Sequence, residues 1–257
     1  MSNDPLLSIR DVSVHFAGIV ALDGVSFDVA RGDICGLIGP NGAGKTTLFN
    51  CLSRLYTPSA GTIAFEGTQL LDVPAHKIAQ LGIGRTFQNL ALFKTMTVRK
   101  NVLVGAHAHT KANFLSDALR LPVVRREEAQ LAAEADELID LLDLRAYADV
   151  LVDSLTFGTR KRVELARALA GKPKLLLLDE PAGGLNHDEV EQLRALIVTI
   201  RDRLKLTVLL VEHHMNLVMR VSDKVVALDF GKKIADGTSS VVQNDPDVIR
   251  AYLGTAA

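Results

Sequence analysis

A short stretch in the N-terminal third, Gly39–Thr47, constrains the fold of this chain more than any other feature. It has the sequence GPNGAGKTT, fits the pattern G-x-x-x-x-G-K-[ST], and lies between the apolar run DICGLI and the helical pattern LFNCL. The glycines allow several backbone N–H groups to point at one anion, and the start of the helix adds the positive end of its dipole. We therefore predict a strand-loop-helix unit that binds nucleotide phosphates.

Within this loop, Lys45 is expected to reach the β and γ phosphates and the Thr46 hydroxyl to hold Mg²⁺. The alternative is a chance glycine turn. The loop alone does not specify a reaction, because kinases, GTPases and motor ATPases share it. The residues predicted to contact the nucleotide here are Gly39, Pro40, Asn41, Gly42, Ala43, Gly44, Lys45, Thr46 and Thr47.

Two carboxylates follow a run of leucines in LLLLDE, residues 175–180. A buried strand there would place Asp179 and Glu180 at its C-terminal edge, where ligands gather in such sheets. We expect Asp179 to hold Mg²⁺ and Glu180 to orient the water that attacks the γ-phosphate. The alternative is an acidic pair that caps a helix after a core strand.

A second apolar run, LTVLLVE, ends in HHM, so His213 and His214 also follow a strand. We expect one of them to contact the γ-phosphate or the attacking water, although a histidine at this position is commonly a surface or core residue. Gln88, in GRTFQN, can both donate and accept hydrogen bonds, and it lies where the β-rich part gives way to a helical segment. Its chemistry alone favours a catalytic role only weakly.

The chain as a whole has an α/β pattern. The runs LLSIRDVSVHF, VALDGVSFDV and GTIAFEG alternate apolar and polar residues and predict a small antiparallel sheet. Residues 110–148 predict a helical insertion, with Leu131, Ala135, Leu138 and Leu142 on one face. Continuous apolar strands resume after Thr159, and the last segment, NDPDVIRAYLG, predicts a short helix with Asp245 as its cap, Pro246 in its first turn and Gly254 at its end.

Composition narrows the class of protein. With 257 residues, of which 48% are hydrophobic, the chain suits one α/β domain with an insertion. A net charge of −1 gives no electrostatic case for nucleic-acid binding. Cys35 and Cys51 lack C-x-x-C spacing, so neither a disulfide framework nor a zinc site is expected. The sequence shows no signal layout and no membrane-spanning run, which favours a cytoplasmic location.

Taken in order, these motifs resemble the ATP-binding subunit of an ABC transporter over nearly the whole chain. The resemblance implies a RecA-like P-loop core with an antiparallel β-subdomain (1–90 and 160–257) and a helical subdomain (91–159). It implies that Gly39–Thr47 is Walker A, that Phe16 stacks on the adenine, and that Gln88 is the Q-loop glutamine, which also contacts Mg²⁺. It places the end of Walker B at Asp179 and Glu180, the D-loop at Ala182–Asn186, and the switch histidine at His213. The implied signature residues are Leu155, Thr156, Phe157, Gly158 and Thr159.

Within that family, the chain is most similar to the ATPases of branched-chain, or hydrophobic, amino acid importers. The strings that carry this are GRTFQNLALFKTMTVRKNVLVGAH, the insertion after it, DEPAGGLN, EHHMNLVM and NDPDVIRAYLG. The resemblance implies ATP and Mg²⁺ as ligands and a head-to-tail pair with a second copy or a sister ATPase. It also implies membrane permeases, a periplasmic binding protein and a peripheral place on the inner face of the membrane. Urea or amide importers and lipopolysaccharide-export ATPases are alternatives, and a soluble ABC protein acting on ribosomes or DNA is a more distant one.

Some of these residues also fit purely structural roles, and the sequence departs from the usual family pattern at four positions. Phe16 also fits a core strand residue, the signature stretch also fits a plain helix start, and Arg160–Arg162 also fits a solvated face. None of the four departures removes a residue expected to take part directly in catalysis, so we expect them to affect the rate and the tightness of the closed pair more than the reaction. The departures are Thr156 for Ser, Thr159 for Gln, Glu or Asp, His187 for Pro, and His214 for Asp.

Overall fold

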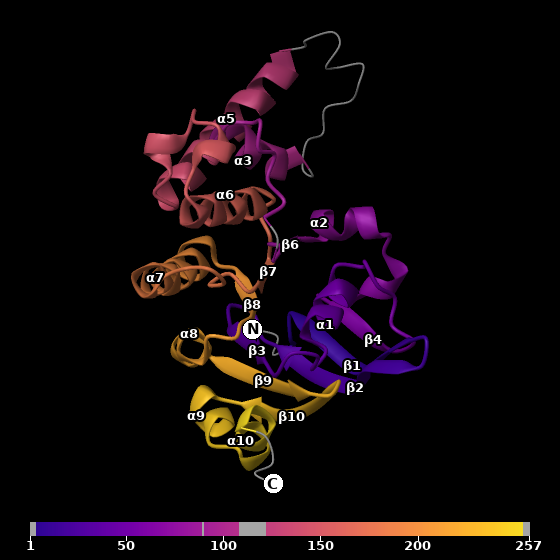
Figure 1. Ribbon diagram of the computed structural model, residues 1–257. Helices are drawn as coiled ribbons and strands as arrows, with labels where there is room; N and C mark the ends of the chain where they lie inside the picture. The colour runs from indigo at the N-terminus through magenta and orange to yellow at the C-terminus, as the bar shows by residue number, and fades with distance from the viewer. Residues whose placement is uncertain (1–3, 89, 108–121, 254–257) are drawn as a thin grey trace. The chain divides into compact units, whose positions relative to one another are not determined.

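A computed structural model describes residues 4–88, 90–107 and 122–253. The chain divides into two units (Figure 1): the first comprises Met1–Ile78 and Lys174–Ala257, and the second comprises Ala79–Pro173. Part of the predicted insertion and Gly254 lie outside the described residues. Within the described part of the chain, no helix is long and apolar enough to cross a membrane.

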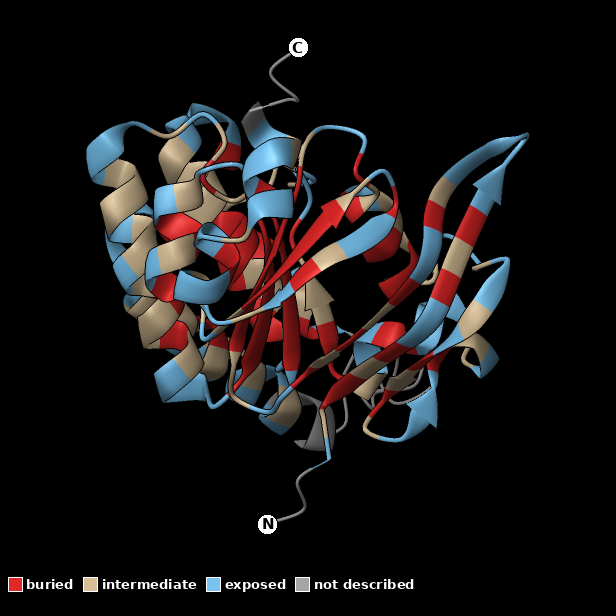
Figure 2. Cartoon of the chain, turned by 90° about the horizontal axis from the view of Figure 1, so that it is seen from below, coloured by how far each residue is buried: buried red, intermediate tan, exposed pale blue. Residues whose placement is uncertain are grey.

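A largely parallel sheet forms the core of the first unit. Its strands run in the order β10-β9-β3-β8-β7, with β3 pairing in parallel with β8 and β9, and β7 pairing in parallel with β8. Every residue of β3, β7 and β8 is buried, as expected for parallel strands covered on both faces, and Figure 2 shows buried residues concentrated along these strands. The strands are β3 (Ile34–Ile38), β7 (Leu175–Asp179), β8 (Thr207–Val211), β9 (Lys224–Asp229) and the antiparallel β10 (Lys232–Gly237).

The predicted antiparallel sheet is confirmed in the same unit. Its strand order is β2-β1-β4-β5, and the burial of β1 alternates along much of its length. Shifts of register interrupt the β1–β2 pairing between Ile9 and His15. Such bulges bend and twist a strand, and the alternation of apolar residues does not reveal them. The strands are β1 (Leu7–Phe16), β2 (Ile19–Val29), β4 (Ala60–Phe65) and β5 (Thr68–Gln69).

Two helices of the first unit begin at side-chain caps. Helix α7 (His187–Leu204) has a full capping box, in which Asn186 accepts from Glu189 N and the Glu189 side chain accepts from Asn186 N. Asp245 caps α10 (Pro246–Leu253), as the sequence predicts. The others are α1 (Lys45–Leu52), α8 (Met215–Val221), α9 (Ser239–Gln243), and the 3₁₀ turns η1 (Leu70–Asp72) and η2 (Ala75–Lys77).

The second unit is helical, as predicted. On α5, Ala135 and Leu142 are buried and Leu131 and Leu138 are half-buried, which confirms the predicted apolar face; Ile139, which the prediction omitted, is also buried. The elements are β6 (Ile83–Arg85), α3 (Val98–Ala106), α5 (Pro122–Leu141), η4 (Arg145–Tyr147), η5 (Val152–Ser154) and α6 (Phe157–Ala170), and the short α2 (Ile78–Leu81) bridges the boundary.

The second unit covers a longer stretch of the chain than the helical segment 91–159 expected from the sequence. Helix α6 packs against α3 and α5 and therefore belongs with them. Its apolar residues form one stripe that suits this packing, but the same stripe would suit a helix covering a parallel sheet. Periodicity alone does not specify the partner of a helix. The division into family subdomains stays a prediction.

Candidate functional site

The loop Gly39–Thr47 joins the end of β3 to the start of α1, which is the predicted strand-loop-helix arrangement. Two glycines are required by its geometry. Gly39 has φ +149°, and a Cβ there would lie 2.2 Å from Leu228 O. Gly44 has φ +100°, and a Cβ there would lie 2.5 Å from Ala21 O. The loop backbone therefore adopts a path closed to other residue types, and it ends at the N-terminus of α1.

Lys45 points back into this loop. Its ammonium donates to Gly39 O at 2.6 Å and to Pro40 O at 2.8 Å, and the residue is buried. Burial lowers the pKa of Lys45, while the nearby charges of Glu180 and Asp179 oppose that shift. The loop thus holds a cation beside two carboxylates, a suitable setting for a ligand that carries both negative phosphates and a divalent metal ion.

The two carboxylates lie at the C-terminal edge of the sheet, as predicted. Asp179 is the last residue of β7 and is 4% exposed. Glu180 follows it with φ +49°, and its backbone N–H donates to Val211 O at 2.9 Å. A left-handed conformation costs a residue with a Cβ about 1–2 kcal/mol. Strain of this kind is found where the surrounding structure holds a functional side chain in place.

Glu180 and His213 are brought together. The His213 Nε2 lies 2.6 Å from Glu180 Oε1, which is within hydrogen-bonding distance. The His213 side chain is 40% exposed and that of Glu180 only 17%, so the pair is accessible from the histidine side. The structure thus places His213, and not His214, against the acidic pair.

Sequence reasoning missed a third carboxylate at this edge. Glu212 follows β8 and is only 1% exposed. Its Oε1 accepts from Ala182 N, and its Oε2 accepts from His213 N and His214 N. The available signal was that LTVLLVE ends in an acidic residue just as LLLLDE does.

The residues expected to hold Mg²⁺ in the first unit supply oxygen atoms, the donors that this cation prefers. Thr46 is exposed in the first turn of α1, and Asp179 is the buried carboxylate. Among the described residues, no group of three or more His, Cys, Asp or Glu side chains could hold a metal ion by itself. This donor set fits Mg²⁺ that shares its coordination shell with nucleotide phosphates and water, and not a cage built from protein alone.

Phe16, the predicted adenine partner, ends β1 and is 40% exposed. Its ring meets that of Tyr56 edge to face, with centroids 5.2 Å apart. A half-exposed aromatic ring at a strand end is not a core residue, so the core alternative is not what the structure shows. Stacking on adenine stays a prediction.

In the second unit, the stretch 155–159 begins α6. Leu155 is buried, Phe157 and Gly158 occupy the first two helical positions, and Thr156 is the N-cap. The Thr156 hydroxyl accepts from Thr159 N at 3.3 Å and lies 2.9 Å from the Thr159 hydroxyl. Thr159 is therefore part of the cap, and the N–H groups of the first turn lie at the positive end of the helix dipole.

Gln88 is exposed and follows β6 in the second unit. The backbone beside it is held by Glu164 of α6, which is 3% exposed and accepts from Phe87 N at 3.2 Å. Burial raises the pKa of Glu164, and the hydrogen bonds from backbone N–H groups act against that shift. Helix α6 thus carries the stretch 155–159 at its start and holds the segment of Gln88 along its length.

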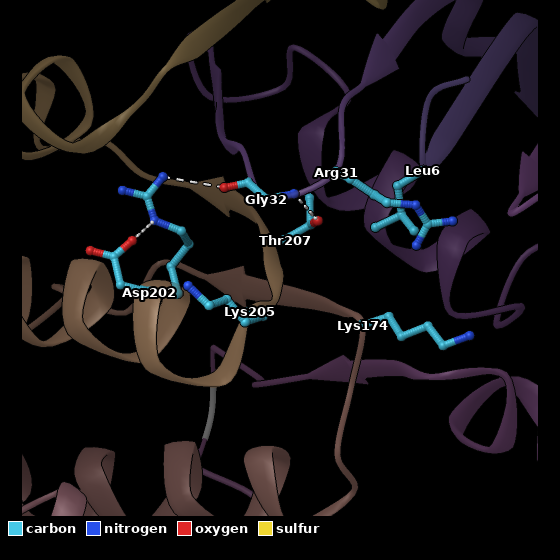
Figure 3. A pocket seen from close by; sticks show the side chains of 8 residues that line it. Leu6, Arg31, Gly32, Lys174, Asp202, Lys205 and Thr207 are labelled. Carbon is cyan, nitrogen blue, oxygen red and sulfur yellow. Dashed lines mark hydrogen bonds and ion pairs between the residues drawn. The ribbon is translucent and has the colours of Figure 1, made fainter. Parts of the chain in front are cut away.

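A pocket of about 410 Å³ lies at the opposite end of the same strands, near residues that precede β3, β7 and β8 (Figure 3). Its cations are largely neutralised within the first unit. Glu66 pairs with Arg31 at 2.7 Å and with Lys174 at 2.6 Å, and Arg201 pairs with Asp202 at 2.6 Å. The pocket therefore offers little net positive charge to a nucleotide, in contrast to the loop at the other edge.

Comparison with known proteins identifies the family. The model of the ABC transporter family matches residues 22–183, which include the glycine-rich loop, the stretch 155–159 and the acidic pair. The chain belongs to the ABC transporter family of ATPases. A second model, for the branched-chain amino acid ATP-binding cassette transporter, matches residues 232–257.

Similar proteins of this family cover the whole chain. The BraF branched-chain amino acid transport ATP-binding protein of Pseudomonas aeruginosa is 42% identical over 98% of this chain and 99% of its own length. The LivG protein of the same description from Escherichia coli is 41% identical over 99% of this chain and 100% of its own. A crystal structure of an ATP-binding cassette in its ADP conformation has a TM-score of 0.83 and 29% identity, covering 98% of this chain and 99% of that one.

The C-terminal segment of this ABC ATPase contacts the loop Gly39–Thr47. The Tyr252 hydroxyl, on α10, accepts a hydrogen bond from Gly39 N at 2.7 Å. Burial raises the pKa of Tyr252, so its hydroxyl keeps its proton at neutral pH. The segment matched by the branched-chain model thus reaches the first residue of the phosphate-binding loop.

Proposed function

We propose that this ABC ATPase energises the uptake of branched-chain or other hydrophobic amino acids. The observation that carries the proposal is the 42% identity with BraF over nearly the full length of both chains, together with the match at 232–257. On this proposal the chain works with membrane permeases and a periplasmic binding protein. It lies on the inner face of the membrane and pairs with a sister ATPase or a second copy.

In the proposed reaction, the Walker A loop binds ATP with Mg²⁺. The N–H groups of the loop and Lys45 neutralise the β and γ phosphates, and Thr46 and Asp179 would hold the metal ion. Mg²⁺ supplies charge neutralisation between the phosphates. The Glu180 carboxylate accepts a hydrogen bond from the attacking water and so orients it, while His213 holds the carboxylate in place beside the γ-phosphate.

The second half of the nucleotide site comes from a partner chain on this proposal. The start of α6 presents backbone N–H groups and a helix dipole, which suit the γ-phosphate of an ATP held by another chain's Walker A. ADP lacks that phosphate. Hydrolysis therefore loosens the pair, and the segment around Gln88 passes the change to the permease.

Transport in membrane vesicles tests the substrate class. The chain is purified with the permeases that accompany it in its native membrane, reconstituted with their binding protein, and assayed for ATP-driven uptake of radiolabelled leucine, with the Glu180→Gln protein as the inactive control. We expect leucine uptake that requires ATP and is absent in the control. Uptake of urea or an amide with no uptake of leucine would replace the proposed substrate, and co-purification with ribosomes instead of permeases would replace the transport role.

A further inference from the structure

Glu212 is the buried charged residue of this site that the reaction above does not use. It lies one residue beyond β8 and one before His213, with 1% of its surface exposed. Burying a carboxylate costs several kcal/mol unless hydrogen bonds compensate for the lost water. Packing alone therefore does not explain a carboxylate at this buried position.

The compensation comes entirely from backbone N–H groups near the two catalytic side chains. Glu212 Oε1 accepts from Ala182 N at 2.5 Å, two residues after Glu180. Glu212 Oε2 accepts from His213 N at 3.0 Å and from His214 N at 3.3 Å. One side chain thus joins the turn that carries Glu180 to the turn that carries His213.

The hydrogen bonds of Glu212 link β7 and β8 beyond the last paired residues of the two strands. Within the sheet, β7 and β8 pair up to Asp179 and Val211, and Glu180 N donates to Val211 O. Beyond that point the two segments separate into turns, and Glu212 supplies a connection between them. The 2.6 Å contact of His213 Nε2 with Glu180 Oε1 depends on both turns keeping their places.

The number and kind of donors make both the charge and the length of Glu212 important. An ionised carboxylate has two accepting oxygens, whereas the amide of glutamine has one, and its NH₂ would face a backbone N–H. Aspartate keeps the charge but is one methylene shorter. Because both oxygens of Glu212 already accept from the backbone and the residue is buried, Glu212 is unsuited to activate water itself.

We propose that Glu212 is a positioning residue for ATP hydrolysis, which aligns Glu180 with His213 by holding the backbone of both turns. This rests on the proposed roles of Glu180 and His213. It assigns Glu212 an effect on the rate of the chemical step and little effect on ATP binding, since its side-chain hydrogen bonds go to Ala182, His213 and His214 and not to the loop Gly39–Thr47.

The test compares the full-length Glu212→Gln protein with Asp223→Asn, a carboxylate control from the opposite end of the sheet. Asp223 is exposed, and it accepts from Ile34 N at 2.8 Å and from Arg201 Nη1 at 3.2 Å. For each protein, kcat and KM for ATP are measured at saturating Mg²⁺, with the affinity for a fluorescent ATP analogue and the melting temperature. Glu212→Asp is measured in the same way, so that the test survives if the glutamine variant does not fold.

We expect Glu212→Gln to lower kcat about 10- to 100-fold, the range typical of groups that orient a functional ligand, with KM and analogue affinity within about threefold of wild type. Glu212→Asp should retain an intermediate kcat, and Asp223→Asn should lose melting temperature without losing kcat. The proposal is overturned if Glu212→Gln, or Glu212→Asp where only that variant folds, keeps the wild-type kcat. It is also overturned if Asp223→Asn lowers both kcat and the melting temperature to the same degree as Glu212→Gln does. Absence of hydrolysis in the wild type, or activity in Glu180→Gln, would instead refute the roles proposed for the site.

Discussion

The C-terminal edge of the parallel sheet, where we propose that catalysis takes place, depends on residues held in conformations that they would not adopt in a free chain. Glu180 has a left-handed backbone and Lys45 is a buried cation, and each is fixed by hydrogen bonds to the backbone of a neighbouring segment. Because the positions are fixed before a nucleotide binds, little reorganisation is needed when charge develops in the transition state. Single substitutions at this edge should therefore change rate more than folding.

Replacing His213 with alanine tests the pair directly. The change removes the Nε2 contact with Glu180, so we expect kcat for ATP to fall about 100-fold or more, as for the loss of one well-placed donor. His214→Ala is the control, since that neighbouring side chain is also exposed and its backbone N–H donates to the same Glu212 carboxylate. Steady-state phosphate release measures both. Equal losses in the two variants would argue against a specific role for His213.

The two cysteines should be inert in the folded protein. Burial raises the pKa of Cys35 to about 12 and that of Cys51 to about 11. At pH 8, below both values, the thiolate fraction is about one in ten thousand for Cys35 and about one in a thousand for Cys51. Ellman's reagent should label neither thiol in the native protein and both in denaturant. Fast labelling of either in the native state would contradict this burial.

At the scale of elements, the sequence predicts strands better than it predicts what holds their ends. Uninterrupted apolar runs identified β7 and β8, because only a strand covered on both faces is apolar throughout. The same pattern does not encode which backbone groups pair past the strand end, so the role of Glu212 was missed. The alternation in β1 predicted its sheet but not its bulges, which depend on backbone geometry. For α6, the apolar stripe predicted a buried face without specifying what covers it.

The capping box of α7 offers a test of stability at this scale. Asn186→Ala removes the acceptor for Glu189 N and should lower stability by about 1 kcal/mol, the usual value for losing an N-cap side chain. For a chain of this size that corresponds to a fall of about 2–4 °C in melting temperature. Asn244→Ala, at the exposed end of α9, is the control and should change little. A stable Asn186→Ala protein would show that the D-loop turn does not depend on the box.

A substitution at the start of α6 tests the effect of Thr159, which departs from the usual family pattern. Thr159→Gln keeps the backbone N–H that Thr156 caps and adds a longer polar side chain of the kind common in the family. We expect ATP-dependent pairing of chains to occur at a several-fold lower protein concentration, and sedimentation with ATP and without Mg²⁺ measures this. Thr159→Ala serves as the control for loss of the hydroxyl contact. No difference between glutamine and threonine would show that this position does not contact the partner's nucleotide.

At the scale of the whole molecule, the residues that we propose bind the nucleotide are divided between the two units. Walker A, the acidic pair and His213 lie in the first unit, while Gln88 and the start of α6 lie in the second. On the proposed mechanism each ATP is enclosed by the first unit of one chain and the second unit of another. A chain by itself then has half of each site, and hydrolysis becomes coupled to the separation of two chains.

The most direct test of the central claim, that the edge formed by Glu180 and His213 hydrolyses ATP, is the release of labelled phosphate from Mg²⁺-ATP by wild type and by Glu180→Gln. The substitution keeps the size of the side chain but removes the carboxylate that orients the water. We expect the variant to bind ATP as tightly as wild type, to accumulate as an ATP-bound pair, and to release phosphate at least about 100-fold more slowly. Phosphate release by Glu180→Gln at the wild-type rate would contradict the account.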